Sequence, residues 1–394
     1  MTDTRPETPM RFFYYYPTHD KPSGGNKELR LHASLLREAG VETFLLRDEQ
    51  FFARPNSFDD DVFYRVPIDL APVPFERAGD HLKPDDVVIL PEVLLRDSLA
   101  TCAPWNCRVA VNNQNGFYGL RYGPPRALAR SRIEFVFAIS PYVAALCHHF
   151  YGVPRDRIFH VSPWIVRPPF EIAEPAADSA LAVSYMPRKM PDLVRRVREA
   201  VQRAHPDVPW VEIDGVPEPE VARRLRANRV FFVAQDLEGC PLTALEAMTC
   251  NAIVAGFPGT ANFPHPYATA ANGFWVHDRD TAAAAVAVGK AIDLARAGGE
   301  PYRRMLEAEH ATARRYDRAS VLEGLREVAA VVANRAYAER MGPRASLGRR
   351  GWLQAARLLY DADRLGLAAR LAGKVVGTAK RLAKKRSEKP GAAS

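Results

Sequence analysis

Cysteine is scarce in this chain, with five residues among 394, an odd number scattered along the sequence. The two nearest in sequence, Cys102 and Cys107, have no histidine and no second cysteine pair at the spacing of a zinc site. We therefore expect five reduced thiols in a cytoplasmic chain and no metal site.

Long apolar runs are also missing. No stretch of about 18 apolar residues occurs, so we expect no membrane-spanning helix. The N-terminal stretch TDTRPETPM is polar and has no apolar core, so we expect no signal peptide. No G-x-G-x-x-G pattern with a following acidic residue is present, which argues against a nicotinamide dinucleotide as cofactor. We expect no cofactor of any kind.

The overall composition is that of a soluble globular protein, with 47% hydrophobic and 25% charged residues. The length predicts about two domains, each large enough for its own core. The formal net charge of +8 suits a phosphate-bearing ligand or an anionic membrane surface.

Short apolar runs alternate with helical patterns, which predicts an α/β fold with mostly parallel sheets and helices on both faces. A Pro-rich stretch at 161–179 interrupts the alternation, which then restarts. We predict an N-terminal Rossmann-like domain over 1–165, a linker over 166–180, a second Rossmann-like domain over 181–330, and C-terminal helices with a basic tail over 331–394. The predicted strands are 12–17, 41–46, 87–90, 108–111, 135–140, 181–186, 210–213, 230–235, 252–257 and 273–276.

One stretch, EGCPLTALEAM at 238–248, places two carboxylates among residues that favour burial. Pro241 suits the first position of a helix over 241–251, because its missing N–H needs no partner there. That helix is apolar nearly all round, so we expect it to be buried and Glu246 to need a hydrogen-bond partner. Glu238 precedes the helix, at the carboxyl end of a strand. The backbone from Gly239 to Thr243 opens a helix N-terminus that attracts phosphate.

A carboxylate can accept hydrogen bonds from two adjacent hydroxyls. Along the stretch, Glu238 is therefore a hydroxyl acceptor, the backbone at 239–243 a phosphate site, and Glu246 a second hydroxyl acceptor. A nucleotide-sugar carries groups in this order. The stretch resembles the E-x7-E motif of retaining glycosyltransferases with the GT-B fold (glycosyltransferase group 1, family 4-like). The resemblance implies two Rossmann-like domains that face each other across a cleft, with C-terminal helices. It also implies a metal-independent transfer of a hexose-type sugar from a nucleotide-diphosphate sugar, with retention of configuration.

The resemblance assigns roles to several residues. Glu238 would hold the sugar hydroxyls and Glu246 the ribose hydroxyls of the donor. Arg188 and Lys189 would stabilise the leaving diphosphate and would form the catalytic group together with Glu238. The remaining donor contacts would come from Gly239, Cys240, Pro241, Leu242 and Thr243. A glycine pair and the residue after it, Gly24, Gly25 and Asn26, would form a loop that contacts the donor phosphate or the acceptor.

Three features depart from the pattern of that family. Arg188 and Lys189 are adjacent, where relatives have several residues between the two cations, so Arg195 or Arg196 could substitute for one of them. Relatives have a glycine pair followed by Glu where this chain has GFPGTANFPHP at 256–266. Many relatives also carry a histidine where this chain has amides that do not titrate near pH 7. We expect these amides to contact sugar or acceptor: Asn113, Gln114 and Asn115.

Three histidines, His148, His149 and His265, have no partner pattern, and we interpret them as structural or surface residues. The C-terminal stretch from Trp352 mixes apolar and basic residues. It is typical either of a peripheral contact with anionic membrane or of a surface helix with a basic end. The partners implied are a nucleotide-sugar donor and a glycan, lipid-linked or small-molecule acceptor, in cell-envelope polysaccharide synthesis, without nucleic acid. Two alternatives stay open: a non-catalytic sugar-nucleotide or glycan-binding protein, and a sugar-nucleotide epimerase or phosphorylase.

Overall fold

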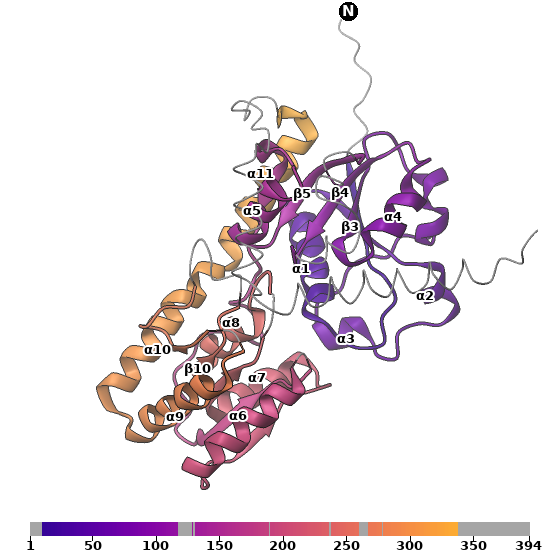
Figure 1. Ribbon diagram of the computed structural model, residues 1–394. Helices are drawn as coiled ribbons and strands as arrows, with labels where there is room; N and C mark the ends of the chain where they lie inside the picture. The colour runs from indigo at the N-terminus through magenta and orange to yellow at the C-terminus, as the bar shows by residue number, and fades with distance from the viewer. Residues whose placement is uncertain are drawn as a thin grey trace, which may run out of the picture. The chain divides into compact units, whose positions relative to one another are not determined.

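The computed structural model describes residues 10–116, 128, 131–188, 190–235, 238–259, 267–277 and 279–337. These residues form two β-sheets, each flanked by helices (Figure 1). None of the helices in these ranges is long and apolar enough to cross a membrane. Lys189, His265 and the basic C-terminal stretch lie outside the described residues.

The first sheet has six strands in the order β2-β1-β3-β4-β5-β6, and every pairing is parallel. Residues of β1 are buried on both faces of the sheet, as its unbroken apolar run predicts. The strands are β1 (Arg11–Tyr15), β2 (Glu42–Leu46), β3 (Val87–Pro91), β4 (Arg108–Asn113), β5 (Ile133–Ala138) and β6 (Ile158–His160). Its helices are α1 (Gly24–Glu38), α2 (Glu49–Ala53), α3 (Asp60–Tyr64), α4 (Leu95–Cys102) and α5 (Pro141–His149), with short 3₁₀ turns at Phe75–His81, Glu92–Leu94 and Arg155–Arg157.

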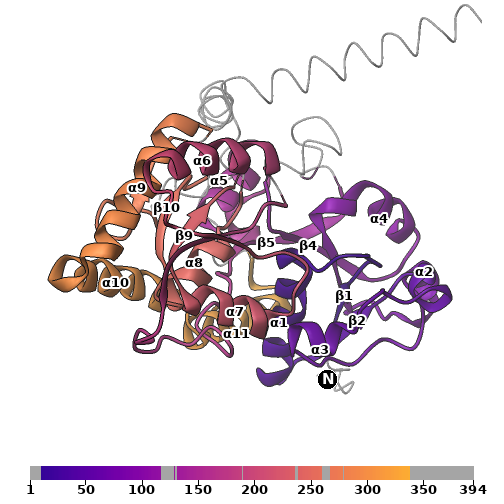
Figure 2. The ribbon, with the colours of Figure 1, turned by 90° about the horizontal axis from the view of Figure 1, so that it is seen from below.

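The second sheet has five parallel strands in the order β11-β10-β9-β7-β8. Helices α6 and α9 lie side by side against β9 and β10 (Figures 1 and 2), and their apolar residues form one buried cluster with that face of the sheet. The strands are β7 (Ala180–Tyr185), β8 (Trp210–Glu212), β9 (Asn228–Val233), β10 (Ile253–Gly256) and β11 (Phe274–Trp275). The helices are α6 (Pro191–Ala204), α7 (Glu218–Ala227), α8 (Leu242–Thr249), α9 (Thr281–Ala297) and α10 (Gly299–Ala313).

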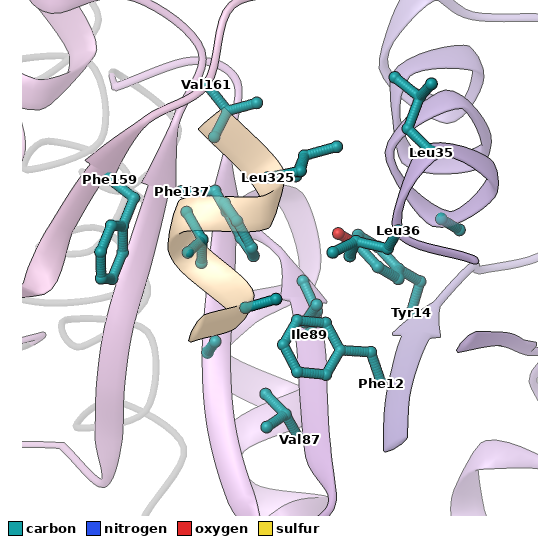
Figure 3. Close-up of a cluster of buried hydrophobic side chains, with 14 of the residues drawn as sticks. Phe12, Tyr14, Leu35, Leu36, Val87, Ile89, Phe137, Phe159, Val161 and Leu325 are labelled. Carbon is teal, nitrogen blue, oxygen red and sulfur yellow. The ribbon is translucent and has the colours of Figure 1, made fainter. Parts of the chain in front are cut away.

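The last described helix, α11 (Arg318–Asn334), follows a 3₁₀ turn at Arg314–Tyr316 and packs on the first sheet. Figure 3 shows Leu325 of α11 close to Val161 and Phe137, in the same buried cluster as Leu36 of α1. The predicted second domain, over 181–330, included most of this helix. That boundary is wrong for α11, because its apolar stripe is buried against the first sheet instead.

All five cysteines are buried free thiols. His148 is also buried, and its Nδ1 lies 3.0 Å from the carbonyl oxygen of Val153, so its structural interpretation holds. Gly40 follows α1 with φ of +86°, the left-handed conformation predicted for a glycine after a helix.

Candidate active site

The strand order reverses once in each sheet, between β1 and β3 in the first and between β7 and β9 in the second. In open parallel sheets, ligands bind at such reversals, beyond the carboxyl ends of the strands. The segment after β1 supplies 20–24 and the segment after β7 supplies Met186 and Arg188, and all of these line the same cavity.

This cavity has a volume of about 450 Å³, which suits a small-molecule ligand. Two predicted groups of site residues meet there, since Gly24 and Arg188 line it together with the start of α8. The lining residues are Asp20, Lys21, Pro22, Ser23, Gly24, Lys27, Ser57, Phe58, Phe63, Tyr64, Phe170, Met186, Arg188, Ile213, Asp214, Gly215, Val216, Glu218, Val221, Leu242, Thr243 and Glu246.

Helix α8 is buried nearly all round, as its sequence predicts, and only Leu242 and Thr243 at its start are partly exposed. The predicted start was wrong by one residue. Pro241 is the N-cap, with φ of −89° and ψ of 66°, and the helix begins at Leu242. Pro241 supplies no side-chain cap, and no side chain in the described part of the chain is recorded as capping the N–H groups of the first turn. Thr243, in this turn, lines the cavity.

The sequence led us to expect a loop at the glycine pair, but the structure has a helix there. Gly24, Gly25 and Asn26 form the first turn of α1, and the hydroxyl of Ser23 caps this turn by accepting from the Asn26 N–H. The lack of a side chain still matters, because a Cβ on Gly24 would lie 2.8 Å from Leu242 Cδ1. The first turns of α1 and α8 are therefore in close contact.

Glu246 has the hydrogen-bond partner that its burial requires, and this partner is Lys27 of α1. Lys27 Nζ donates to Glu246 Oε1 and lies 3.0 Å from Glu218 Oε1 at the start of α7. Arg167 binds the same Glu218 carboxylate through two hydrogen bonds of 2.7 and 2.9 Å. All four side chains are less than a tenth exposed. We call Lys27, Glu246, Glu218 and Arg167 the buried charge network.

The electrostatics of this network follow from its burial. Burial raises the pKa of Glu246, although Lys27 opposes the rise. Burial by itself would lower the pKa of Lys27, but Glu218 and Glu246 raise it above its usual value, so Lys27 is charged. Burial also works against ionisation of Glu218, yet Lys27 and Arg167 together hold its pKa below the usual value. Lys27 is thus the cation that favours the ionised form of both buried carboxylates, and with Arg167 it outweighs the effect of burial at Glu218.

Glu28, adjacent to Lys27 in α1, is fully buried. Neither of its carboxylate oxygens has a hydrogen-bond partner in the part of the chain that the structure describes. Burial raises the pKa of Glu28 to about 7, while Lys27 and Arg167 lower it. Near neutral pH this carboxyl is therefore about half protonated.

The other predicted donor residues lie outside the lining of the cavity. Glu238 follows β9 and is partly exposed. Gly239 packs against the end of β4, where a Cβ would lie 1.8 Å from the carbonyl oxygen of Gln114, so only glycine fits. Cys240 is buried, and burial raises the pKa of its thiol well above the usual value. Arg188 is exposed at the cavity, whereas Arg195 is bound to Glu199 along α6, 3.1 Å away.

The three amides at the end of β4 and directly after it also lie outside the cavity lining. Gln114 Nε2 donates to the carbonyl oxygen of Gly25 at 2.9 Å and so braces the first turn of α1. Asn113 is buried, with its Nδ2 3.3 Å from Cys147 Sγ. Asn115 is buried as well. The structure thus shows Gln114 supporting the glycine contacts, and a role of the three amides toward sugar or acceptor stays a prediction.

Sequence reasoning missed Lys27, Glu218 and Arg167. A charged residue two positions after the glycine pair was the available signal for Lys27, and Arg167 lies in the segment that we interpreted only as a linker. Among the described residues, no group of three or more His, Cys, Asp or Glu could hold a metal ion.

No model of a known protein family matches the sequence, and no curated protein matches it. Solved structures nevertheless resemble its fold. The pneumococcal O-GlcNAc transferase GtfA, in complex with UDP and GlcNAc, is 11% identical, with a TM-score of 0.58 over 82% of this chain and 99% of that chain. A glycosyltransferase from Rickettsia africae is 14% identical, with a TM-score of 0.58 over the same shares. Anabaena HepE, in complex with UDP and glucose, is 12% identical, with a TM-score of 0.56 over 82% of this chain and all of that chain. This likeness shows that the chain has the GT-B fold, as the sequence predicted.

Proposed function

We propose that this protein is a glycosyltransferase that moves a sugar from a nucleotide-diphosphate sugar to an acceptor hydroxyl, with retention of configuration and without a metal ion. One observation carries the proposal. The 450 Å³ cavity is lined by the start of α1, by Arg188 after β7 and by Thr243 and Glu246 of α8, so it joins a hydroxyl acceptor to a phosphate site. Similar structures were solved with UDP bound, which supports a nucleotide in this position.

In this scheme Glu246 accepts hydrogen bonds from the ribose. Lys27 holds Oε1, so Oε2 is available to a ribose hydroxyl. The diphosphate lies at the N-terminus of α8, where the dipole and uncapped N–H groups favour negative charge. Arg188, which is exposed at the cavity, supplies a bidentate cation for the departing phosphate. These charges replace those that a metal ion would otherwise supply.

The transfer breaks the bond between the anomeric carbon and the donor phosphate oxygen and forms a bond to the acceptor oxygen on the same face of the sugar. The acceptor proton passes to the departing phosphate oxygen, so no protein base is needed. This fits the amides at Asn113, Gln114 and Asn115, which cannot take a proton near pH 7. Glu238 binds the sugar hydroxyls and orients the anomeric carbon.

The test is nucleotide release from UDP-, GDP- and ADP-sugars with neutral glycan and lipid-linked acceptors, followed by the anomeric configuration of the product. Replacing Glu238 with alanine should reduce the rate at least about tenfold, because charged hydrogen bonds to the sugar are lost. Glu323→Ala, on the exposed face of α11, is the matched control and should leave the rate unchanged. Release that is undiminished in Glu238→Ala contradicts the role of Glu238, and release from none of the donors contradicts the proposed function.

A further inference from the structure

A second cavity, of about 470 Å³, lies beyond the carboxyl end of β2 and is built entirely from the first domain. Helices α2 and α3 and the segment between them supply most of its wall, which includes Phe51, Asn56, Asp59 and Asp61. Ser57 and Phe58 line both this cavity and the 450 Å³ cavity, so the two adjoin. A ligand in the second cavity would therefore lie next to a donor in the first.

A buried guanidinium, that of Arg47, lines this cavity with its hydrogen bonds incomplete. Arg47 is 1% exposed and lies against the rings of Phe51 and Tyr16, with its Cζ 3.7 and 4.6 Å from their centroids. It donates to Asn56 Oδ1 at 2.9 Å and reaches Asp60 only at 3.4 Å. Its Nε has no partner among the described residues. A buried guanidinium with spare donors favours a ligand that brings oxygen atoms.

The rim of the cavity offers carboxylate oxygens that can accept from a ligand. Asp59 caps α3 with Oδ1, which accepts from the N–H groups of Asp61 and Val62, and its Oδ2 makes no such contact with the described residues. Asp61 accepts from Arg30 through Oδ1 only. Asp60, in contrast, is fully engaged: it accepts from the Tyr16 hydroxyl at 3.0 Å and from Asn56 at 2.8 Å, and also lies near His19 and Arg47.

These groups determine the charge and chemistry of the ligand. Two arginines, Arg30 and Arg47, oppose three aspartates at 59–61, so the cavity carries no excess positive charge for a phosphate or carboxylate. Free carboxylate oxygens bind hydroxyl groups, guanidinium donors bind hydroxyl oxygens, and the rings of Phe51 and Phe58 offer apolar faces. A neutral sugar has hydroxyl edges and apolar faces and meets all three requirements.

We propose that this second cavity binds the acceptor, and that the acceptor presents a neutral sugar to it. The proposal rests on the glycosyltransferase function for its role, because the donor cavity adjoins this one. It narrows the acceptor to a glycan whose receiving end carries no phosphate or carboxylate. Asp59 and Asp61 then determine acceptor specificity, since each contributes an oxygen that no group of the described chain occupies.

The experiment measures binding to the full chain by saturation-transfer NMR. The probes are methyl glycosides of glucose, galactose, mannose and N-acetylglucosamine, with glucose 6-phosphate and glucosamine as charged counterparts. UDP, GDP and ADP are present, so that the donor cavity is blocked. The test variant combines Asp59→Ser, which keeps a capping hydroxyl for α3, with Asp61→Ala. The control is Asp69→Ala, which removes a surface aspartate that pairs with Arg37 at 2.9 Å, as Asp61 pairs with Arg30, but does not line the cavity.

We expect at least one neutral glycoside to bind, the double variant to weaken it about tenfold or more, and the control to leave it unchanged. The proposal is overturned if no neutral glycoside binds, if the double variant binds as the wild type does, or if glucose 6-phosphate or glucosamine binds more tightly. Nucleotide binding is measured on the same samples and should be equal in all three proteins. Glycoside binding without nucleotide binding would contradict the assignment of the 450 Å³ cavity to the donor, but would still support a sugar in the second cavity.

Discussion

Replacing Lys27 with methionine tests the buried charge network directly. The side chain keeps a similar length, but two buried carboxylates, Glu246 and Glu218, lose a shared cation. Removing one partner of a buried ion pair costs about 3–5 kcal/mol, because the remaining charge has no compensation. At about 2–4 °C per kcal/mol for a domain of this size, the melting temperature should fall by about 6–20 °C at pH 7.5.

The assay is differential scanning fluorimetry, with Arg77→Met as the control. Arg77 binds Glu49 at 2.7 Å, but both side chains are at least half exposed, so this loss should cost less than about 1 kcal/mol. Adding Glu246→Gln to Lys27→Met should restore much of the loss, since the uncompensated charge is then removed and Glu218 keeps Arg167.

The pH dependence has a definite sign. Burial raises the pKa of Glu246, and without Lys27 nothing in direct contact among the described residues opposes that rise. A carboxyl with a raised pKa in the folded state favours folding while it is protonated and loses this contribution as the pH rises. The deficit of Lys27→Met should therefore shrink on acidification. A deficit below about 1 kcal/mol at pH 7.5, or no recovery in the double variant, would refute the reasoning.

Two further predictions concern other buried residues. Between about pH 4.5 and 7 the unfolded chain ionises Glu28, whereas the folded chain, in which its pKa is about 7, keeps it protonated, so the wild type loses stability over this range. Glu28→Gln should flatten this loss, and its gain in the free energy of unfolding at pH 8 approaches about 3 kcal/mol. Equal pH profiles of the melting temperature in the two proteins would contradict this. Leu325→Ala should destabilise the first sheet by about 2–5 kcal/mol, and the measurement is faster hydrogen exchange in β1 and β3. Leu94→Ala changes an exposed residue and should have little effect. Faster exchange confined to the second sheet would show that α11 does not pack on the first sheet.

The sequence predicts the strands of both sheets well, because parallel strands that are buried on both faces appear as short, unbroken apolar runs. β6 was missed, since it has three residues and only the middle one, Phe159, is buried. The helical pattern of α11 was also recognised, but not the sheet it contacts. An apolar stripe shows that a helix packs against something, and it does not identify the surface.

In the candidate site, too, the sequence predicts features that depend on neighbouring residues, but not contacts between residues far apart in the chain. The burial of Glu246 and its need for a partner follow from the apolar residues around it in α8. The partner does not follow, because Lys27 lies 219 positions earlier in the chain. Likewise, the glycine pair was recognised, but Ser23 as its cap, which turns the predicted loop into the first turn of α1, was not. The second cavity depends on several contacts around Arg47, and no single sequence motif predicts them.

We propose above all that the 450 Å³ cavity binds a nucleoside diphosphate with its ribose on Glu246. The most direct test is calorimetric titration of UDP, GDP and ADP, each beside its 2′-deoxy form, into the wild type and into Glu246→Gln. We expect one ribonucleotide to bind the wild type about tenfold or more tightly than its deoxy form, because a hydrogen bond to a charged group is lost. We expect Glu246→Gln to lose most of this discrimination. Failure of all three nucleotides to bind the wild type, or equal discrimination in both proteins, would contradict the account.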